Sequence, residues 1–427
     1  MIEDRKKIHG VVWIGLSQVS LLAGNFLLLK IITTNLSVAD FGYYSLCMTF
    51  ILFIRQIVYD PFSMVIAKSC ATGDEDKKKS SLGLQVVRYS TDRAGVLIVI
   101  LGFVFFAFEF FIVKSIRLSP LLFFCLIYLL SNGAQGVYIN VFNSIGERKL
   151  AAFSSIVDSS LKVAVVALIF KLFSGDLFIG LASASVSALL TLFFIRNLVA
   201  VGFSDTEQSL KEIRTVLHEN FMVSLPLLFP SLLNAFKSVG DRWLLAGFMG
   251  VDDLAAYTVL LQVGYFPVIL LFGIVQTYMA PFIYKFCNLR DFHNCQLLKM
   301  LMLKILFASI IFACVSAGVT IFLADWMLDI LVGPSYRIYA KYLSVFVFAG
   351  SLSASSGILQ LIIFGVFDTK KSSKLIATSM VLIFVIFFIL IYFLKFEGAI
   401  GGLVFAGIIP MLIFSWAVHK NLSRLVD

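Results

Sequence analysis

Long apolar runs alternate with short polar turns along almost the whole chain. A helix that crosses a bilayer needs roughly 20 apolar residues, because each residue adds about 1.5 Å. By that measure the pattern predicts about twelve spanning helices. They cover residues 10–32, 40–66, 94–113, 119–143, 150–172, 177–198, 221–247, 254–283, 300–324, 339–366, 374–394 and 398–419.

Composition agrees with this pattern. Hydrophobic residues make up 60% of the 427 residues and charged residues only 14%, and the mean hydropathy is +0.98. A water-soluble domain of this size cannot bury so much apolar surface. The first apolar run is too long for a signal peptide and lacks a small-residue cleavage site, so we expect it to be the first helix. The sequence therefore predicts an all-α integral membrane protein.

Lysine and arginine are distributed unevenly between the predicted loops. If the N-terminus is cytoplasmic, loops on that side carry 22 of the 34 basic residues and the opposite loops carry six. Basic residues favour the cytoplasmic side, so both termini are expected there. The net charge of +9 mostly reflects this bias and does not indicate nucleic-acid binding.

Two short motifs occur in both halves of the chain. Val38-Ala-Asp-Phe-Gly-Tyr-Tyr44 opens the second span, and Val251-Asp-Asp-Leu-Ala-Ala-Tyr257 opens the eighth; residues 145–149 and 367–371 join later spans at the same offset. The offset is six spans, which keeps orientation and predicts a parallel pseudo-two-fold repeat. We expect lobes at 1–199 and 221–427, joined by a cytoplasmic linker at 200–220. Transporters commonly bind substrate between such repeats.

A few charges lie inside the apolar spans, where each costs roughly 2.5–3.5 kcal/mol on insertion scales. Asp158 and Lys162, like Lys237 and Asp241, are four residues apart and share a helix face, so a structural ion pair is an alternative to a functional role for each. Lys30 can reach the outer surface by extending its side chain, and Lys304 the cytoplasmic one. The basic candidates for substrate binding are Arg55, Lys237, Arg242, Lys30 and Lys162, and the acidic candidates for ion coupling are Asp60, Asp158 and Asp241.

Arg55 and Arg242 are the hardest of these charges to explain structurally. Arg55 follows the start of its span by about 22 Å, too deep to reach the outer surface easily. Arg242 follows Pro226 and Pro230, which should kink or unwind the first half of its span. The first, second, seventh and eighth spans also carry most of the polar residues. We therefore expect these four helices to line a water-filled, electropositive central cavity.

The sequence offers little support for an enzyme, a nucleotide-binding site or a metal site. The sequence has no Gly-x-x-x-x-Gly-Lys-Ser/Thr, Gly-x-Ser-x-Gly or His-Glu-x-x-His motif, so we expect a transporter without cofactors and not an enzyme. Cys287, His293 and Cys295 share a loop, but free thiols are favoured over a metal site. Runs of small residues at 180–188 and 350–357 suit close helix packing. The alternative is a surface along which helices slide during a conformational change.

The segments Leu36-Ser-Val-Ala-Asp-Phe-Gly-Tyr-Tyr44, Gly240-Asp-Arg242 and 251–257, together with the repeat, resemble the polysaccharide-transporter branch of the MOP superfamily, which includes the Wzx O-antigen flippases. The resemblance implies a bacterial inner-membrane protein that moves an undecaprenyl-pyrophosphate-linked oligosaccharide to the periplasmic leaflet by alternating access, with ion coupling in some members. Arg55, Lys237 and Arg242 would hold the pyrophosphate or an acidic sugar. A polysaccharide polymerase and a chain-length regulator would be partners.

Three alternatives stay open at this point. Multidrug antiporters of the same superfamily favour cations, whereas basic residues prevail inside these spans. Flippases of the peptidoglycan precursor would be expected to have fourteen spans. A polysaccharide polymerase, from a different class, would be expected to carry a long periplasmic loop, and the longest outer loop here is only about 325–338.

Overall fold

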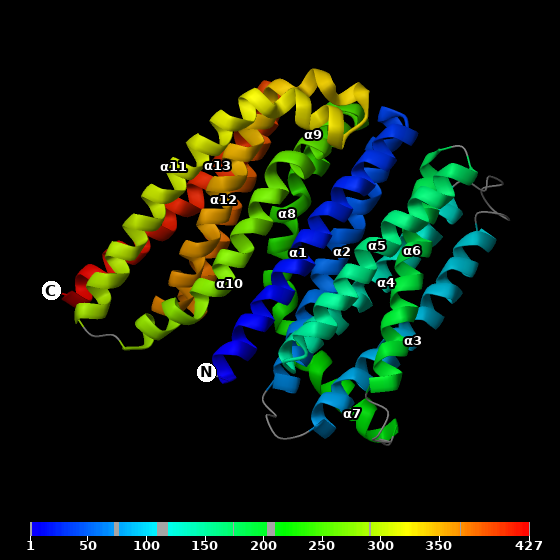
Figure 1. Ribbon diagram of the computed structural model, residues 1–427, viewed down its shortest axis with the longest axis horizontal. Coiled ribbons are helices and arrows are strands. Elements are labelled where there is room, and N and C mark those ends of the chain that lie inside the picture. The colour runs from blue at the N-terminus through cyan, green and yellow to red at the C-terminus, as the bar shows by residue number, and fades with distance from the viewer. Residues whose placement is uncertain are drawn as a thin grey trace. The chain divides into compact units, whose positions relative to one another are not determined.

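The computed structural model describes residues 2–71, 77–108, 118–173, 175–202, 210–289, 292–367 and 369–426. Nearly all of these residues are helical (Figure 1). The elements are α1 (Ile2–Asn35), α2 (Val38–Ala71), α3 (Lys77–Phe108), α4 (Leu118–Ser144), α5 (Arg148–Leu172), α6 (Leu177–Gly202), α7 (Leu210–Ser224), η2 (Leu225–Leu227), α8 (Leu228–Met249), α9 (Val251–Leu260), η3 (Leu261–Tyr265), α10 (Phe266–Leu289), α11 (Phe292–Leu331), η4 (Pro334–Tyr339), α12 (Ala340–Val366) and α13 (Thr369–Val426).

The predicted spanning helices correspond to these elements. Within the described residues, 10 helical segments are long and apolar enough to cross a membrane. One of them, residues 371–421, contains the last two predicted spans, because α13 is kinked at Lys395, where φ is 54°. The third predicted span, 94–113, begins in α3 and ends outside the described residues. The chain is therefore an all-α membrane protein, as the hydropathy pattern predicts.

The helices form two compact units, residues 1–236 and 237–427. The boundary lies inside α8, which begins after the 3₁₀ turn η2. Pro226 occupies η2 and Pro230 lies in the first turn of α8, where a proline is tolerated. The prolines thus change the helical geometry of the seventh span locally, as predicted, through one 3₁₀ turn between α7 and α8 within a helical segment that runs from residue 210 to 249.

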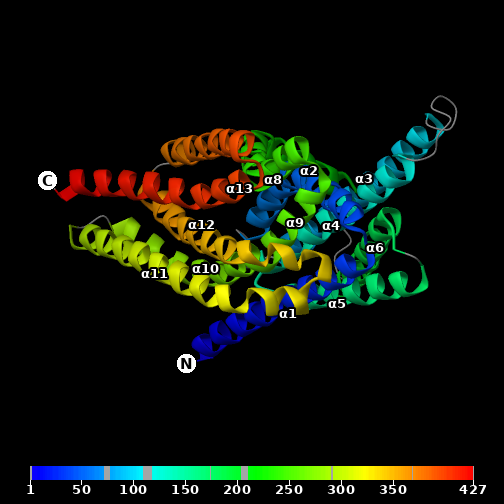
Figure 2. The same ribbon diagram turned by 90° about the horizontal axis from the view of Figure 1, so that it is seen from above.

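The same helix pairings occur within each unit. In the first unit α1 packs on α5, α2 on α4, and α4 on α6. In the second unit the equivalent spans pair in the same way. The helix α8 packs on the first half of α13 through Phe248 and Phe388, and α10 packs on α12. The second half of α13 packs on α12 through Gly407 and Leu352. Figures 1 and 2 show α11, α12 and α13 side by side. This shared scheme supports the six-plus-six repeat read from the sequence.

The repeated motif begins a helix in both units. Ser37 precedes α2; its hydroxyl donates to the Asp40 carboxylate (2.6 Å) and accepts from the Asp40 backbone N–H (3.1 Å). The second of these bonds satisfies a backbone N–H that has no partner within the first helical turn. Asp253 occupies the same third position of α9, after Gly250 with a φ of 97°. A carboxylate there also suits the positive end of the helix dipole.

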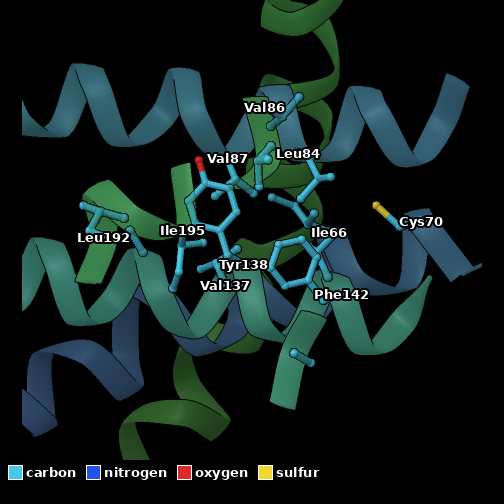
Figure 3. Packing of buried hydrophobic residues seen from close by; sticks show 14 of the residues in the cluster. Ile66, Cys70, Leu84, Val86, Val87, Val137, Tyr138, Phe142, Leu192 and Ile195 are labelled. Carbon is cyan, nitrogen blue, oxygen red and sulfur yellow. The ribbon is translucent and has the colours of Figure 1, made fainter. Parts of the chain in front are cut away.

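The end of the first unit that lies next to α7 contains a dense apolar core. Tyr138 and Phe142 of α4 are completely buried against Leu84 of α3, Ile66 of α2 and Ile195 of α6 (Figure 3). The linker helix α7 packs on α2 and α3 next to this core. Its Arg214 donates a hydrogen bond of 3.1 Å to the hydroxyl of Tyr89, and this bond lowers the pKa of that phenol. The linker helix therefore packs as part of the first unit.

The runs of small residues pack helices closely, as predicted. Ser183, Ser185 and Ser187 of α6 are buried, and Ser185 donates to the Phe124 carbonyl oxygen of α4. A side chain at Gly350 of α12 would lie 2.9 Å from the Tyr265 carbonyl oxygen. Small residues let neighbouring backbones approach, which explains their concentration at these contacts.

Candidate functional site

Two helices of the first unit carry matching polar stripes. Arg55, Tyr59 and Ser63 lie four residues apart on one face of α2, and Asn132, Gly136 and Asn140 do the same on α4. Arg55 Nη1 donates to Asn132 Oδ1 at 2.9 Å, and Asn140 Nδ2 donates to Ser63 Oγ at 2.8 Å. The two bonds lie eight residues apart on each helix, about 12 Å. They join α2 to α4 above and below the space between the stripes.

A cavity of about 170 Å³ lies between these two bonds. Its polar lining comes from Arg55, Tyr59, Asp60, Ser63 and Asn140. Gly133 and Gly136 make room for it on α4: a Cβ at Gly133 would lie 2.7 Å from the Tyr59 ring, whereas a Cβ at Gly136 would meet nothing within 4 Å. We call this space the α2–α4 cavity.

Arg55 is the cation of the α2–α4 cavity. Its Nε atom is buried and has no hydrogen-bond partner, and within the described part of the chain no carboxylate lies in ion-pair distance of it. Asp60 lines the same cavity and interacts with Arg55 only at longer range. A guanidinium offers five donors, and burying them without partners is costly. The site is therefore suited to receive an acceptor group from a ligand or from water.

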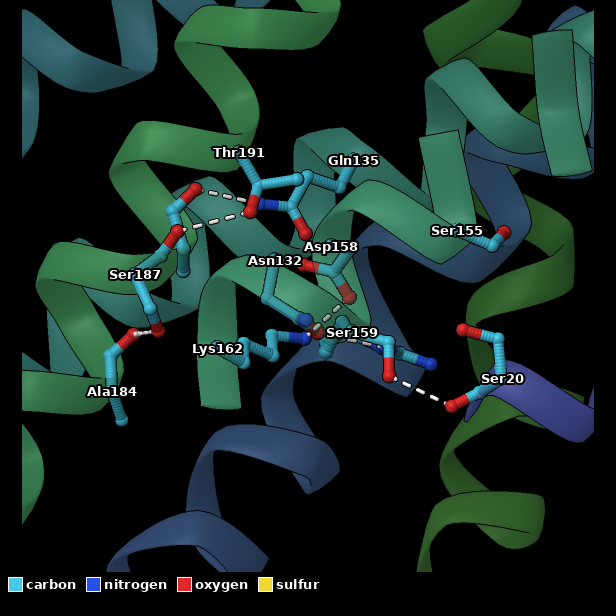
Figure 4. Close-up of polar contacts among 12 residues, drawn as sticks. Ser20, Asn132, Gln135, Ser155, Asp158, Ser159, Lys162, Ala184, Ser187 and Thr191 are labelled. Carbon is cyan, nitrogen blue, oxygen red and sulfur yellow. Dashed lines mark hydrogen bonds and ion pairs between the residues drawn. The ribbon is translucent and has the colours of Figure 1, made fainter. Parts of the chain in front are cut away.

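A buried ion pair lies on the neighbouring helix α5. Lys162 Nζ and Asp158 Oδ2 are 2.7 Å apart, and their side chains are 17% and 11% exposed. Figure 4 shows this pair together with Asn132, the hydrogen-bond partner of Arg55. The ion pair between Asp158 and Lys162, which the spacing of the two residues suggested as a structural alternative, is thus present in the structure. Lys162 and Arg55 are also close enough to repel each other.

The second unit has its own charged cluster. Asp241 of α8 accepts a hydrogen bond of 2.7 Å from the hydroxyl of Tyr257 and one of 2.9 Å from the backbone N–H of Arg242. The Arg242 guanidinium lies 5.6 Å from the centre of the Phe266 ring, and the residue as a whole is only 7% exposed. Tyr257 and Phe266 flank η3, a π-helical segment in the spanning helix formed by α9 and α10. Such segments are often found at functional sites.

The remaining candidates are not brought together. Lys237 is exposed, and among the described residues no ion pair joins it to Asp241, although they share a helix face. The alternative of a Lys237–Asp241 pair is therefore wrong, because Asp241 bonds to Tyr257 of a neighbouring helix instead. Lys30 is half-buried on α1, and Lys304 is exposed on α11. The electropositive chamber expected between the two lobes stays a prediction.

The sequence interpretation overlooked the contribution of α4. It sought polar helices among the first, second, seventh and eighth spans, whereas the α2–α4 cavity takes one wall from the fourth. The signal was present as Asn132, Gly133, Gly136 and Asn140, which recur on one face of an otherwise apolar run. Neutral amides and glycines attract less attention than charges, and nothing in α4 indicates that α2 is its neighbour.

Within the described residues no group of three or more His, Cys, Asp or Glu side chains could hold a metal ion. The side chains of Cys287, His293 and Cys295 lie outside those described. Cys47, Cys70, Cys125 and Cys314 are free thiols.

Comparison with known proteins adds a family and a fold. A family model described as "Polysaccharide biosynthesis protein" matches residues 8–286. No curated protein sequence matches the chain significantly.

Several solved transporters are similar in structure. An outward-facing multidrug resistance MATE family transporter of the MOP superfamily is 13% identical, with 97% of this chain and 96% of that chain covered and a TM-score of 0.66. The inward-facing conformation of such a transporter gives 14% identity, 97% and 98% coverage and a TM-score of 0.65. The MATE transporter VcmN of Vibrio cholerae in its bent form gives 13% identity, 99% coverage of both chains and a TM-score of 0.57. At these identities the likeness establishes the fold alone.

Proposed function

Because the chain belongs to the polysaccharide biosynthesis protein family and is a membrane transporter of the MOP superfamily, we propose that it moves a lipid-linked oligosaccharide across the bacterial inner membrane. The substrate would be an undecaprenyl-pyrophosphate-linked repeat unit of a surface polysaccharide such as O-antigen. It would pass from the cytoplasmic to the periplasmic leaflet by alternating access, with both termini of the protein in the cytoplasm.

The observation that carries this proposal is that Arg55 lines a cavity without an oppositely charged group in contact with it, among the described residues. A guanidinium that lines a cavity at membrane depth, with a buried Nε and no ion-pair partner among the described residues, is costly unless a ligand uses it. Arginine suits phosphate and carboxylate because its planar fork matches their oxygens. Arg242 in the second unit, buried against Phe266, is the matching candidate there. Lys237 remains a further candidate, whereas Lys30 and Lys162 are weaker ones, and Lys162 is already paired with Asp158.

Complementation of a strain that lacks its own O-unit transporter tests this function. The wild-type protein should restore surface polysaccharide, whereas Arg55→Ala and Arg242→Ala should each lower the transport rate by about tenfold or more, because a charge-assisted hydrogen bond contributes about 1.5–3 kcal/mol. Arg337→Ala is the matched control, since Arg337 is 61% exposed. Normal surface polysaccharide in both test variants, at equal protein levels, would refute the assigned role of the two arginines.

A multidrug antiporter of the same superfamily is the second candidate. The half-buried carboxylate of Asp241, bonded to Tyr257, is the observation that favours it, because an acid shielded from water can couple transport to protons. Such an antiporter would change drug susceptibility in a strain without its own drug exporters, and Asp241→Asn would abolish that change. Restored polysaccharide with unchanged susceptibility would favour the flippase.

A further inference from the structure

The α2–α4 cavity carries a pair of opposite charges that do not neutralise each other by contact. Arg55 and Asp60 both line it, yet no ion pair forms between them. Its formal charge is therefore balanced overall, with a cationic and an anionic position kept apart. A diphosphate carries several negative charges and would be repelled by Asp60. A ligand with one acidic group and several hydroxyls fits this arrangement better.

The other lining groups have the chemistry of a sugar site. Asn140 offers an amide and Ser63 a hydroxyl, which together provide donors and acceptors for a ring of hydroxyl groups. Tyr59 places an aromatic side chain in the lining, next to Gly133. A volume of about 170 Å³ is below the roughly 300–1,000 Å³ typical of drug-sized ligands. The cavity is thus sized for a single small ring and not for a whole repeat unit.

We propose that the α2–α4 cavity is a subsite for one acidic monosaccharide unit of the transported glycan. The carboxylate of the sugar accepts from the unpartnered donors of Arg55, while Asp60, Ser63 and Asn140 bond its hydroxyls. The diphosphate is then held elsewhere, with Arg242 of the second unit as its candidate anchor. This inference rests on the proposed function for its physiological meaning, but the subsite itself can be measured without transport.

Saturation-transfer NMR on the purified full-length protein in nanodiscs provides the test, with glucuronate, glucose and inorganic pyrophosphate as probes. Glucuronate should receive saturation from the wild-type protein and should bind more tightly than glucose. Gly136→Leu should abolish this binding, because position 136 lines the cavity, a Cβ there meets nothing within 4 Å, and a longer side chain would take up the space of the ligand. Asn140→Ala should weaken it by about fivefold, the effect of one lost hydrogen bond.

Asn143→Ala is the matched control, because Asn143 is exposed on the same helix and does not line the cavity. It should bind glucuronate as the wild type does, and pyrophosphate binding should survive Gly136→Leu. Three results would overturn the proposal: no glucuronate signal from the wild type, glucuronate binding unchanged by Gly136→Leu, or loss of pyrophosphate binding together with that of glucuronate. Failure of complementation with intact glucuronate binding would instead count against the proposed function alone.

Discussion

At the scale of residues, the buried charges divide into those with a close opposite charge and those without one. Asp158 and Lys162 neutralise each other at 2.7 Å, and Asp241 is held by the Tyr257 hydroxyl. Arg55 has only the neutral Asn132 as a close partner among the described residues. Because an unpaired charge is costly at membrane depth, this difference favours a structural role for Lys162 and is the reason for the ligand-binding role that we propose for Arg55.

The ion pair on α5 therefore predicts a specific mutational pattern. Asp158→Ala should lower the free energy of unfolding by about 3–5 kcal/mol, because it leaves the Lys162 ammonium buried without its partner. The double variant Asp158→Ala/Lys162→Met should recover most of this loss. Thermal unfolding in detergent measures both effects, and complementation measures transport. A double variant that folds normally but no longer transports would show that the pair has a role in transport beyond stability, which would contradict the structural interpretation.

At the scale of elements, the close packing of the π-helical segment η3 against α12 depends on two glycines, one in each of these elements. Gly264 of η3 lies against Leu343 and Phe346 of α12, and Gly350 of α12 lies against the Tyr265 backbone. The ring of Tyr257 also stacks edge-on against Phe346 at 5.3 Å. The Asp241–Tyr257 bond is thus positioned by contact between the second and fourth spanning helices of its unit, as the α2–α4 cavity is in the other.

Enlarging Gly350 should disturb this packing. Gly350→Ala places a Cβ 2.9 Å from a backbone oxygen and 3.1 Å from a backbone carbon of Tyr265, so the helices must separate. We expect a loss of about 1–3 kcal/mol in the free energy of unfolding. Gly318→Ala on α11 is the control, because its Cβ meets nothing within 4 Å, and it should be neutral or stabilising by up to about 1 kcal/mol. Equal thermal stability of the two variants would contradict the packing argument.

At the scale of the whole molecule, the two units repeat one scheme of helix pairing. In each unit the first spanning helix packs on the fifth, the second on the fourth, and the fourth on the sixth. The first of these pairings brings Gly24 against Ser159 in the first unit and Gly240 against Phe384 in the second. A parallel repeat of six helices requires both ends of the chain to lie on the same side of the membrane. Because basic residues favour the cytoplasmic side of membrane proteins, we expect that side to be the cytoplasm.

Reporter fusions check this topology. Alkaline phosphatase is active only after export, so we expect activity when it is fused after Gly333, between α11 and η4, and none when it is fused after Asp427. Green fluorescent protein at the C-terminus should fluoresce. An active phosphatase at both positions would mean an even number of spans between Gly333 and Asp427, where the repeat requires three, and the six-plus-six repeat would then be untenable.

The sequence alone determined the membrane class, the spanning segments, the repeat and the local change of helical geometry at Pro226, because these follow from local hydropathy, spacing and backbone geometry. It also placed Asp158 beside Lys162, since both lie on one helix face. Only the tertiary structure decided that Asp241 bonds to Tyr257 instead of Lys237, and that Arg55 bonds to Asn132 and shares a cavity with Asn140. Helical periodicity fixes which side chains share a face. Which neighbouring helix supplies their partners depends on packing between segments far apart in the chain.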